Sequence, residues 1–148
     1  KDISYNSLWF PIVFARALKK NKKSGSIINL SSIYGLVAQD QNIYKNTNIT
    51  ENIVYNYNKS GLINFTKALA SKYTKNGIRS NVVCPGGVIN KSDKFQNSYF
   101  LKNYAKRVPI SRLAKPSEIA SVILFLASDS SSYLSGSTIV VDGGWLSI

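Results

Sequence analysis

Histidine is absent from the 148 residues, and cysteine occurs once, as Cys84. A Ser-His-Asp triad, a Cys-His nucleophile pair and a zinc site made of His and Cys therefore lack their parts, and no metal site is predicted. Cys84 has no partner for an intramolecular disulfide, which suits the reducing cytoplasm, the location we expect. No apolar run approaches the roughly 18 residues that cross a bilayer, and no signal-peptide pattern opens the sequence, so no membrane partner is predicted.

Acidic residues are also few. Only 7 Asp and Glu accompany 19 Lys and Arg, which gives a formal net charge of +12. Such a charge makes nucleic acid a candidate partner. The basic residues are spread along the chain, however, and the one dense group, residues 19–23, follows a helical pattern, where lysines favourably meet the negative end of the helix dipole. We therefore favour a solvated basic surface and expect no nucleic-acid partner.

Apolar residues recur at helical spacing in three segments, residues 7–23, 53–75 and 116–129. Three others have the nearly continuous apolar pattern of strands covered on both faces, residues 26–31, 77–87 and 136–144. Strands that alternate with helices predict right-handed crossovers and a parallel sheet. The expected fold is therefore α/β, in a single domain over residues 1–148. The polar residues 33–51 follow neither period and predict a long loop, of the kind that is usually functional or disordered.

The stretch "VYNYNKSGLINFTKALA", residues 54–70, contains tyrosines close to a lysine on a predicted helix. Residues four apart project from the same helix face, so Tyr55 and Lys59 can share one site while Tyr57 points elsewhere. A free phenol titrates near pH 10, and a nearby ammonium favours the phenolate form, which makes a tyrosine usable as an acid or base at neutral pH. The spacing alone is common, and by itself it favours two solvated side chains on an ordinary helix.

Four blocks of the sequence, in this order, resemble the short-chain dehydrogenase/reductase family. They are "IINLSSIYG" at residues 27–35, "YNYNKSGLINFTKALA" at 55–70, "GIRSNVVCPGG" at 77–87, and residues 112–144. The resemblance implies the C-terminal part of a Rossmann-type doubly wound parallel sheet in three α/β/α layers, with the N-terminal βαβ half missing. It also implies NAD or NADP as the cofactor, a small-molecule substrate, and a homodimer or homotetramer.

The same resemblance assigns the catalytic residues position by position. Ser32, the second serine of the "SS" pair, would hydrogen-bond the substrate oxygen, while Ser31 would be structural. Tyr55 would be the general acid/base, and Lys59 would contact the ribose of the nicotinamide and assist the tyrosine. Asn6 is the best match for the asparagine that holds a proton-relay water in the family, although its surroundings "YNSLWF" depart from the usual pattern.

For the cofactor, the resemblance adds the turn after the second predicted strand. Pro85 and Gly86 would shape the turn that passes the nicotinamide, and the Val88 backbone would meet the carboxamide. The threonine that is frequent a few positions later is missing from "VINKS", residues 88–92.

The nine glycines form no G-x-G-x-x-G cluster, so the chain has no predicted phosphate loop. We therefore expect this chain alone to be inactive, and NAD and NADP stay undistinguished.

Ser32 and Tyr55 are 23 residues apart in the sequence, which is more than is usual in the family. The excess loop would lie over the substrate side of the site, where Tyr44 or Asn48 could contact a polar substrate; a solvated loop without a substrate contact is the alternative. The loop, with "PGGV" and "VDGGW", is most similar to the branch associated with flagellin modification and surface-sugar biosynthesis. The predicted function is hydride transfer to or from a polar, sugar-derived substrate. A 3-oxoacyl carrier-protein reductase, a non-catalytic binding protein and an inactive fragment are the alternatives.

Overall fold

The computed structural model describes residues 3–47, 49–50, 52–90 and 98–148, with the backbone alone for residues 3–6. Its sheet has three strands, β1 (Gly25–Leu30), β2 (Ile78–Pro85) and β3 (Thr138–Val141). They are hydrogen-bonded in the order β1-β2-β3, and both pairs are parallel. The predicted parallel α/β fold of the Rossmann type is therefore confirmed.

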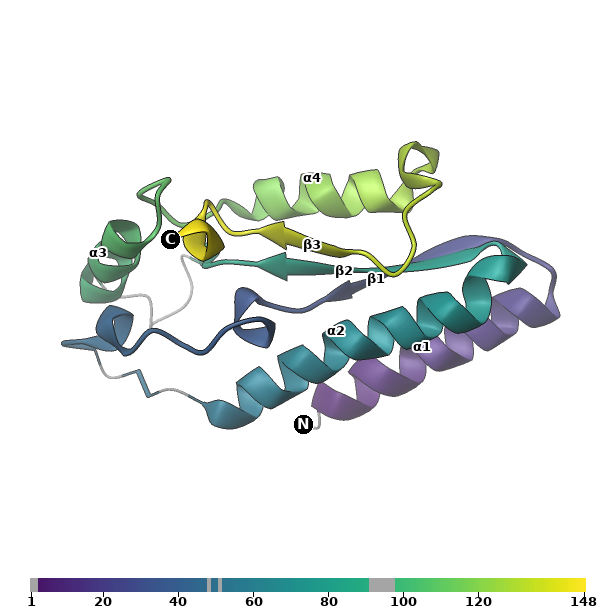
Figure 1. Ribbon diagram of the computed structural model, residues 1–148, viewed down its shortest axis with the longest axis horizontal. Helices are drawn as coiled ribbons and strands as arrows, with labels where there is room; N and C mark the ends of the chain where they lie inside the picture. Colours follow the sequence, from purple (N-terminus) through teal and green to yellow (C-terminus); the bar gives the residue numbers. More distant parts are fainter. Residues whose placement is uncertain (1–2, 48, 51, 91–97) are drawn as a thin grey trace.

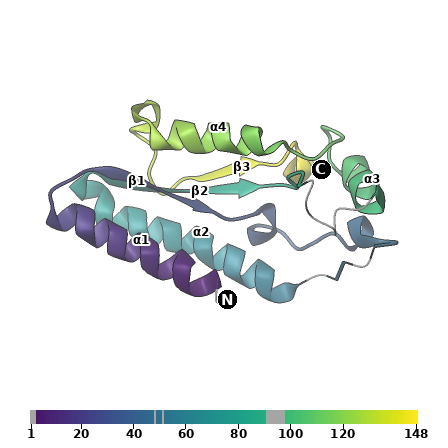
Figure 2. The same ribbon diagram turned by 180° about the vertical axis from the view of Figure 1, so that it is seen from behind.

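Helices cover both faces of this sheet (Figures 1 and 2). The helices α1 (Ile3–Lys20) and α2 (Ile53–Tyr73) lie side by side on one face, and α4 (Pro116–Ala127) lies on the other. A fourth helix, α3 (Ser98–Arg107), lies beyond the end toward which the strand arrows point. The carboxyl ends of the strands therefore face α3 and the long loop, and this edge is where open α/β sheets bind their ligands.

Two apolar clusters hold the layers together. On one face, Ala15 of α1 and Leu69 and Tyr73 of α2 pack on Ile27 and Ile78 of the sheet, and all five are buried. On the other face, α4 contributes buried residues that pack against Val83, namely Ile119 and Leu126. Each large apolar side chain removed from water contributes about 1.5–3 kcal/mol, so these two clusters fix the helices against the strands.

The structure differs from the sequence-based prediction in three places. The helix α3 was not predicted; five of the ten residues of "SYFLKNYAKR" are apolar or aromatic, but only Tyr104 of them is buried. The predicted long loop contains two short 3-10 helices, η1 (Ile33–Gly35) and η2 (Gln41–Tyr44). The first helix begins at Ile3 instead of near residue 7, so that Pro11 lies inside the helix and not in its first turn.

Candidate active site

A cleft of about 440 Å³ opens at the carboxyl ends of β1 and β2. One wall comes from η1 and the first turn of α2, and the opposite wall comes from the long loop and α3. Its lining residues are Ser32, Ile33, Tyr34, Gln39, Tyr44, Ile49, Thr50, Asn52, Tyr55, Gly86, Gly87, Phe100 and Tyr104. Of the residues predicted from the sequence, the cleft therefore brings together Ser32, Tyr55, Gly86 and Tyr44.

Ser32 is the second residue after β1 and is buried in the cleft wall. Its backbone is extended, and its hydroxyl oxygen accepts the Tyr34 N–H at 3.2 Å, which makes it the N-cap of η1. A hydroxyl that accepts one hydrogen bond still has a proton to donate. Ser31 has a different task, since its hydroxyl donates to the Lys59 backbone carbonyl at 2.8 Å and ties the end of β1 to α2.

Tyr55 and Lys59 lie one turn apart on α2. The Lys59 ammonium lies 5.5 Å from the centroid of the Tyr55 ring and donates to the Leu30 carbonyl at 2.9 Å. Tyr55 lines the cleft, whereas the side chain of Tyr57 does not and is 78% exposed. Of the two tyrosines, Tyr55 thus combines access to the cleft with a cation beside its ring.

Burial governs the charge state around Lys59. Desolvation lowers the pKa of the Lys59 ammonium, opposed by the nearby Cys84 thiol. Burial likewise raises the pKa of Cys84, partly offset by a hydrogen bond from Ser31, so this thiol stays neutral. A half-buried ammonium that uses one donor on Leu30 retains two others, which suits a ligand with hydroxyl groups.

Asn52 is a site residue that the sequence-based prediction missed. Its side-chain oxygen accepts the backbone N–H groups of Val54, at 3.0 Å, and Tyr55, at 3.3 Å, so it caps α2 at the turn that carries Tyr55. Asn is among the preferred N-cap residues. An asparagine directly before a periodic apolar segment was the signal that could have identified it.

The turn after β2 contains the predicted cofactor residues. Pro85 ends the strand and is buried, and Gly86 and Gly87 line the cleft. The Gly87 N–H donates to the hydroxyl of Tyr104 from α3, and a Cβ at Gly87 would lie 2.6 Å from that ring. Val88 lies between Gly87 and Ile89, both of which pair with the Ala114 backbone. The turn is therefore held on both sides.

Two predicted residues lie outside what the structure describes. Asn6 belongs to α1, but its side chain is outside the described residues, and Asn48 is outside them altogether.

Within the described ranges, no helix has the length and apolar character that crossing a membrane requires. The same ranges contain no cluster of three or more His, Cys, Asp or Glu side chains that could hold a metal ion.

Comparison with known proteins places this geometry in a family. The family model described as enoyl-(acyl carrier protein) reductase matches residues 1–146. A 3-oxoacyl-(acyl-carrier-protein) reductase of Chlamydia trachomatis is 40% identical over 122 residues, which are 82% of this chain and 45% of that protein. The chain belongs to the short-chain dehydrogenase/reductase family. A second member, the 2-keto-3-deoxy-L-fuconate dehydrogenase of Xanthomonas campestris, is 34% identical over 82% of this chain and 40% of its own length.

Solved structures of short-chain dehydrogenases support the same family assignment. The short-chain dehydrogenase of Leptospira borgpetersenii with bound NAD+ superposes with a TM-score of 0.83 at 35% identity, over 92% of this chain and 50% of that chain. A 2-deoxy-D-gluconate 3-dehydrogenase from Agrobacterium tumefaciens with bound NADP, described as putative, gives 0.80 at 26% identity, over 93% and 52% of the two chains. The chain thus spans about half the length of the family members it matches.

Proposed function

We propose that this chain supplies the proton chemistry of an oxidoreductase that transfers a hydride between the nicotinamide of NAD or NADP and a hydroxyl or carbonyl group of a polar, sugar-derived substrate. The observation that carries the proposal is the convergence of Ser32 and Tyr55 on one cleft, with the Lys59 ammonium 5.5 Å from the Tyr55 ring. The relatives support it, because they include a sugar-acid dehydrogenase and structures with bound NAD+ and NADP.

Each residue has a defined role in the direction of carbonyl reduction. When bound, the nicotinamide cofactor would supply the hydride for the carbonyl carbon. Tyr55 donates its phenolic proton to the carbonyl oxygen, and solvent returns a proton to the phenolate. Ser32 donates a hydrogen bond to the same oxygen and fixes its direction. Lys59 stabilises the negative charge that develops on Tyr55, and oxidation runs through the same steps in reverse.

The residues at the cleft suit the nicotinamide end of such a cofactor. The Lys59 ammonium and the Tyr55 hydroxyl match the paired hydroxyls of a ribose, and Pro85, Gly86 and Val88 would flank the nicotinamide ring. Gly86 and Gly87 present backbone without side chains to the cleft, which permits close approach of a flat ring. Asn6 would hold the proton-relay water.

We also propose that residues 1–148 are the C-terminal catalytic portion of a longer Rossmann-type domain. The support is that matched family members share 40% to 50% of their length with this chain. The described residues contain no G-x-G-x-x-G turn between a strand and a helix, the motif that receives a pyrophosphate. The isolated chain is accordingly expected to be inactive, and activity is to be measured on the full-length product of the gene.

A second candidate function is reduction of a 3-oxoacyl thioester on an acyl carrier protein. The 40% identity to the chlamydial reductase favours it. Acetoacetyl-CoA as substrate separates the two candidates, since a sugar dehydrogenase should reduce it poorly.

Self-association of the protein is a further expectation. Large apolar side chains are exposed on α1, among them Trp9 at 50%, Phe10 at 70% and Val13 at 57%, beside the exposed Tyr57 of α2. An apolar patch of this kind marks an interaction surface. We propose a cytoplasmic homodimer or homotetramer, and light scattering coupled to size-exclusion chromatography tests the oligomeric state.

The test of the proposed function compares two neighbouring tyrosines in the full-length protein. We expect Tyr55→Phe to abolish nicotinamide-linked turnover, a loss of at least about 100-fold, because general acid/base catalysis contributes on that scale. The matched variant Tyr57→Phe, whose ring is exposed outside the cleft, should keep most of the activity. Equal losses from the two variants would refute the assignment of Tyr55.

A further inference from the structure

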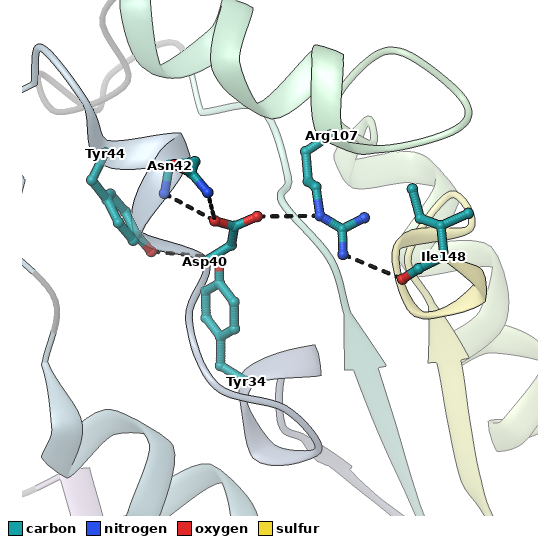
Figure 3. A network of polar contacts seen from close by, with 6 residues as sticks. All are labelled: Tyr34, Asp40, Asn42, Tyr44, Arg107 and Ile148. Atoms are coloured by element: carbon teal, nitrogen blue, oxygen red, sulfur yellow. Dashed lines mark hydrogen bonds and ion pairs between the residues drawn. The ribbon is translucent and has the colours of Figure 1, made fainter.

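Two phenols, one from each wall of the cleft, meet at their hydroxyl groups (Figure 3). Tyr34 belongs to η1, and Tyr44 ends η2 in the long loop. Their hydroxyl oxygens are 3.4 Å apart, and both residues line the same cleft as Ser32 and Tyr55. Hydroxyl pairs usually approach to about 2.7–2.8 Å. A phenol hydroxyl can donate one hydrogen bond and accept others at the same time.

Aromatic neighbours orient both rings. Tyr34 meets Trp145 edge-on, with ring centroids 6.4 Å apart, and Tyr44 stacks beside Phe100 at 6.3 Å. Phe100 also lines the cleft. Contacts of this type restrict the ring and thereby fix the position of its hydroxyl. The two hydroxyls are thus aimed at one place by residues from η1, η2, α3 and the C-terminal segment.

An ion pair between Asp40 and Arg107 also holds the loop that carries Tyr44, as Figure 3 shows. The Asp40 carboxylate accepts the Asn42 backbone N–H at 2.9 Å and the Arg107 Nε at 3.2 Å. Arg107 also donates to the Ile148 carbonyl at 3.3 Å and lies over the Trp145 ring.

Helix α3 holds the same loop again through Asn103. Its side-chain amide donates to the backbone carbonyls of Ile43, at 3.3 Å, and Lys45, at 3.0 Å, on either side of Tyr44. A wall held at several points before the ligand arrives avoids the entropic cost of ordering a flexible loop. The Tyr44 side of the cleft is therefore preorganised for binding.

We infer that Tyr34 and Tyr44 are specificity-determining residues that bind two neighbouring hydroxyl groups of the substrate, away from the carbon that reacts. A phenol hydroxyl both donates and accepts, so an adjacent pair can engage a vicinal diol. Phe100 lines the same cleft and adds apolar surface beside the pair. The substrate class is thus a polyhydroxylated carbonyl compound or its alcohol. This inference rests on the proposed function.

The hydroxyl of Tyr34 is unsuited to proton transfer. Burial, followed by the hydrogen bond with Tyr44, raises the pKa of Tyr34 far above that of a free phenol. Tyr34 therefore stays protonated at every working pH and acts only through hydrogen bonds. Its removal should leave the pH profile of turnover unchanged.

A matched pair of ketones tests the inference on the full-length protein: pentahydroxycyclohexanone and cyclohexanone, which share one ring and differ in hydroxyls. We expect the wild-type protein to favour the hydroxylated ketone in kcat/KM. Tyr34→Phe and Tyr44→Phe should each raise KM for it by about tenfold, with little change in kcat, since each removes one hydrogen bond. Neither variant should change kcat/KM for cyclohexanone, and Tyr133→Phe, at a fully exposed ring, is the control.

The possible failures are distinguishable. If both ketones are reduced equally well, or if the preference is the same in the two variants as in the wild-type protein, the diol-binding pair is refuted while the oxidoreductase activity stands. If the wild-type protein reduces neither ketone nor acetoacetyl-CoA with NADH or NADPH, the proposed function fails, and this inference fails with it.

Discussion

The two walls of the cleft are specified by contacts of very different range along the chain. On the wall of η1 and α2, Tyr55 and Lys59 lie on one helix, and Asn52 caps the turn that carries Tyr55. On the opposite wall, the Asp40–Arg107 ion pair joins residues 67 apart in the sequence. Chemistry that depends on helix spacing is therefore visible in a sequence, whereas a wall assembled from distant residues is not.

The largest expected effect is on the first wall. Lys59→Met should lower kcat at least about 100-fold, because it removes the cation that stabilises charge on Tyr55. The matched control is Lys67→Met on the exposed side of the same helix, which should leave turnover unchanged. Steady-state kinetics with either nicotinamide cofactor measures kcat for both variants. Full activity of Lys59→Met would show that Lys59 has no catalytic role.

A glycine substitution tests the turn that joins the two walls. Gly87→Ala would bring a Cβ to 2.6 Å from the Tyr104 ring, and overpacking of this kind costs about 1–3 kcal/mol in the free energy of unfolding. In Gly61→Ala the new Cβ meets nothing within 4 Å, and alanine in a helix interior should stabilise α2 by up to about 1 kcal/mol. Urea denaturation should show a lower free energy of unfolding for Gly87→Ala and a higher one for Gly61→Ala. An unchanged free energy of unfolding in Gly87→Ala would contradict the packing described.

The cap of α2 should have a smaller effect. Asn52→Ala removes the acceptor of the Val54 and Tyr55 N–H groups, and the loss of such a cap costs about 1 kcal/mol of stability. Fraying of this turn should also lower kcat several-fold, because it displaces Tyr55. Asn64→Ala, at an exposed position of the same helix, is the control. Unchanged thermal unfolding and kcat in Asn52→Ala would show that the cap is dispensable.

The smallest effect concerns the second wall and depends on pH. The Asn42 backbone N–H, with Arg107, holds the pKa of Asp40 below its ordinary value. Because folding lowers this pKa, the ionised Asp40 carboxylate stabilises the folded state at pH values above the ordinary pKa near 4. This contribution disappears as the pH falls through the lower pKa of the folded protein. Asp40→Asn should cost about 0.5 kcal/mol at neutral pH and nothing in acid. Urea denaturation at neutral and at acidic pH measures the free energy of unfolding of this variant, with Asp129→Asn as the control. An equal loss of stability at the two pH values would contradict the role given to the Asp40 carboxylate.

Most of the fold could be predicted from the sequence, since the strands have nearly continuous apolar runs and helices α1, α2 and α4 have apolar residues at helical spacing. Helix α3 was missed although Phe100 and Tyr104 lie four residues apart on it; the contact that buries Tyr104 against Trp145 joins distant residues, which periodicity does not reveal. Of the candidate site, the positions of Ser32 and Tyr55 in one cleft follow from strand ends and helix spacing. The fixing of Tyr44 by Asn103 depends on residues about 60 positions away and has no local signal.

A single-turnover experiment tests most directly the claim that one wall performs the chemistry and the other recognises the substrate. The full-length protein is mixed with pentahydroxycyclohexanone at saturating concentration, and oxidation of the bound reduced nicotinamide is followed by absorbance in the wild-type, Tyr55→Phe and Tyr44→Phe proteins. The account predicts that Tyr55→Phe loses hydride transfer by at least about 100-fold even at saturation, whereas Tyr44→Phe keeps nearly the wild-type rate. Hydride transfer that persists in Tyr55→Phe, or that is lost equally in Tyr44→Phe, would contradict the account.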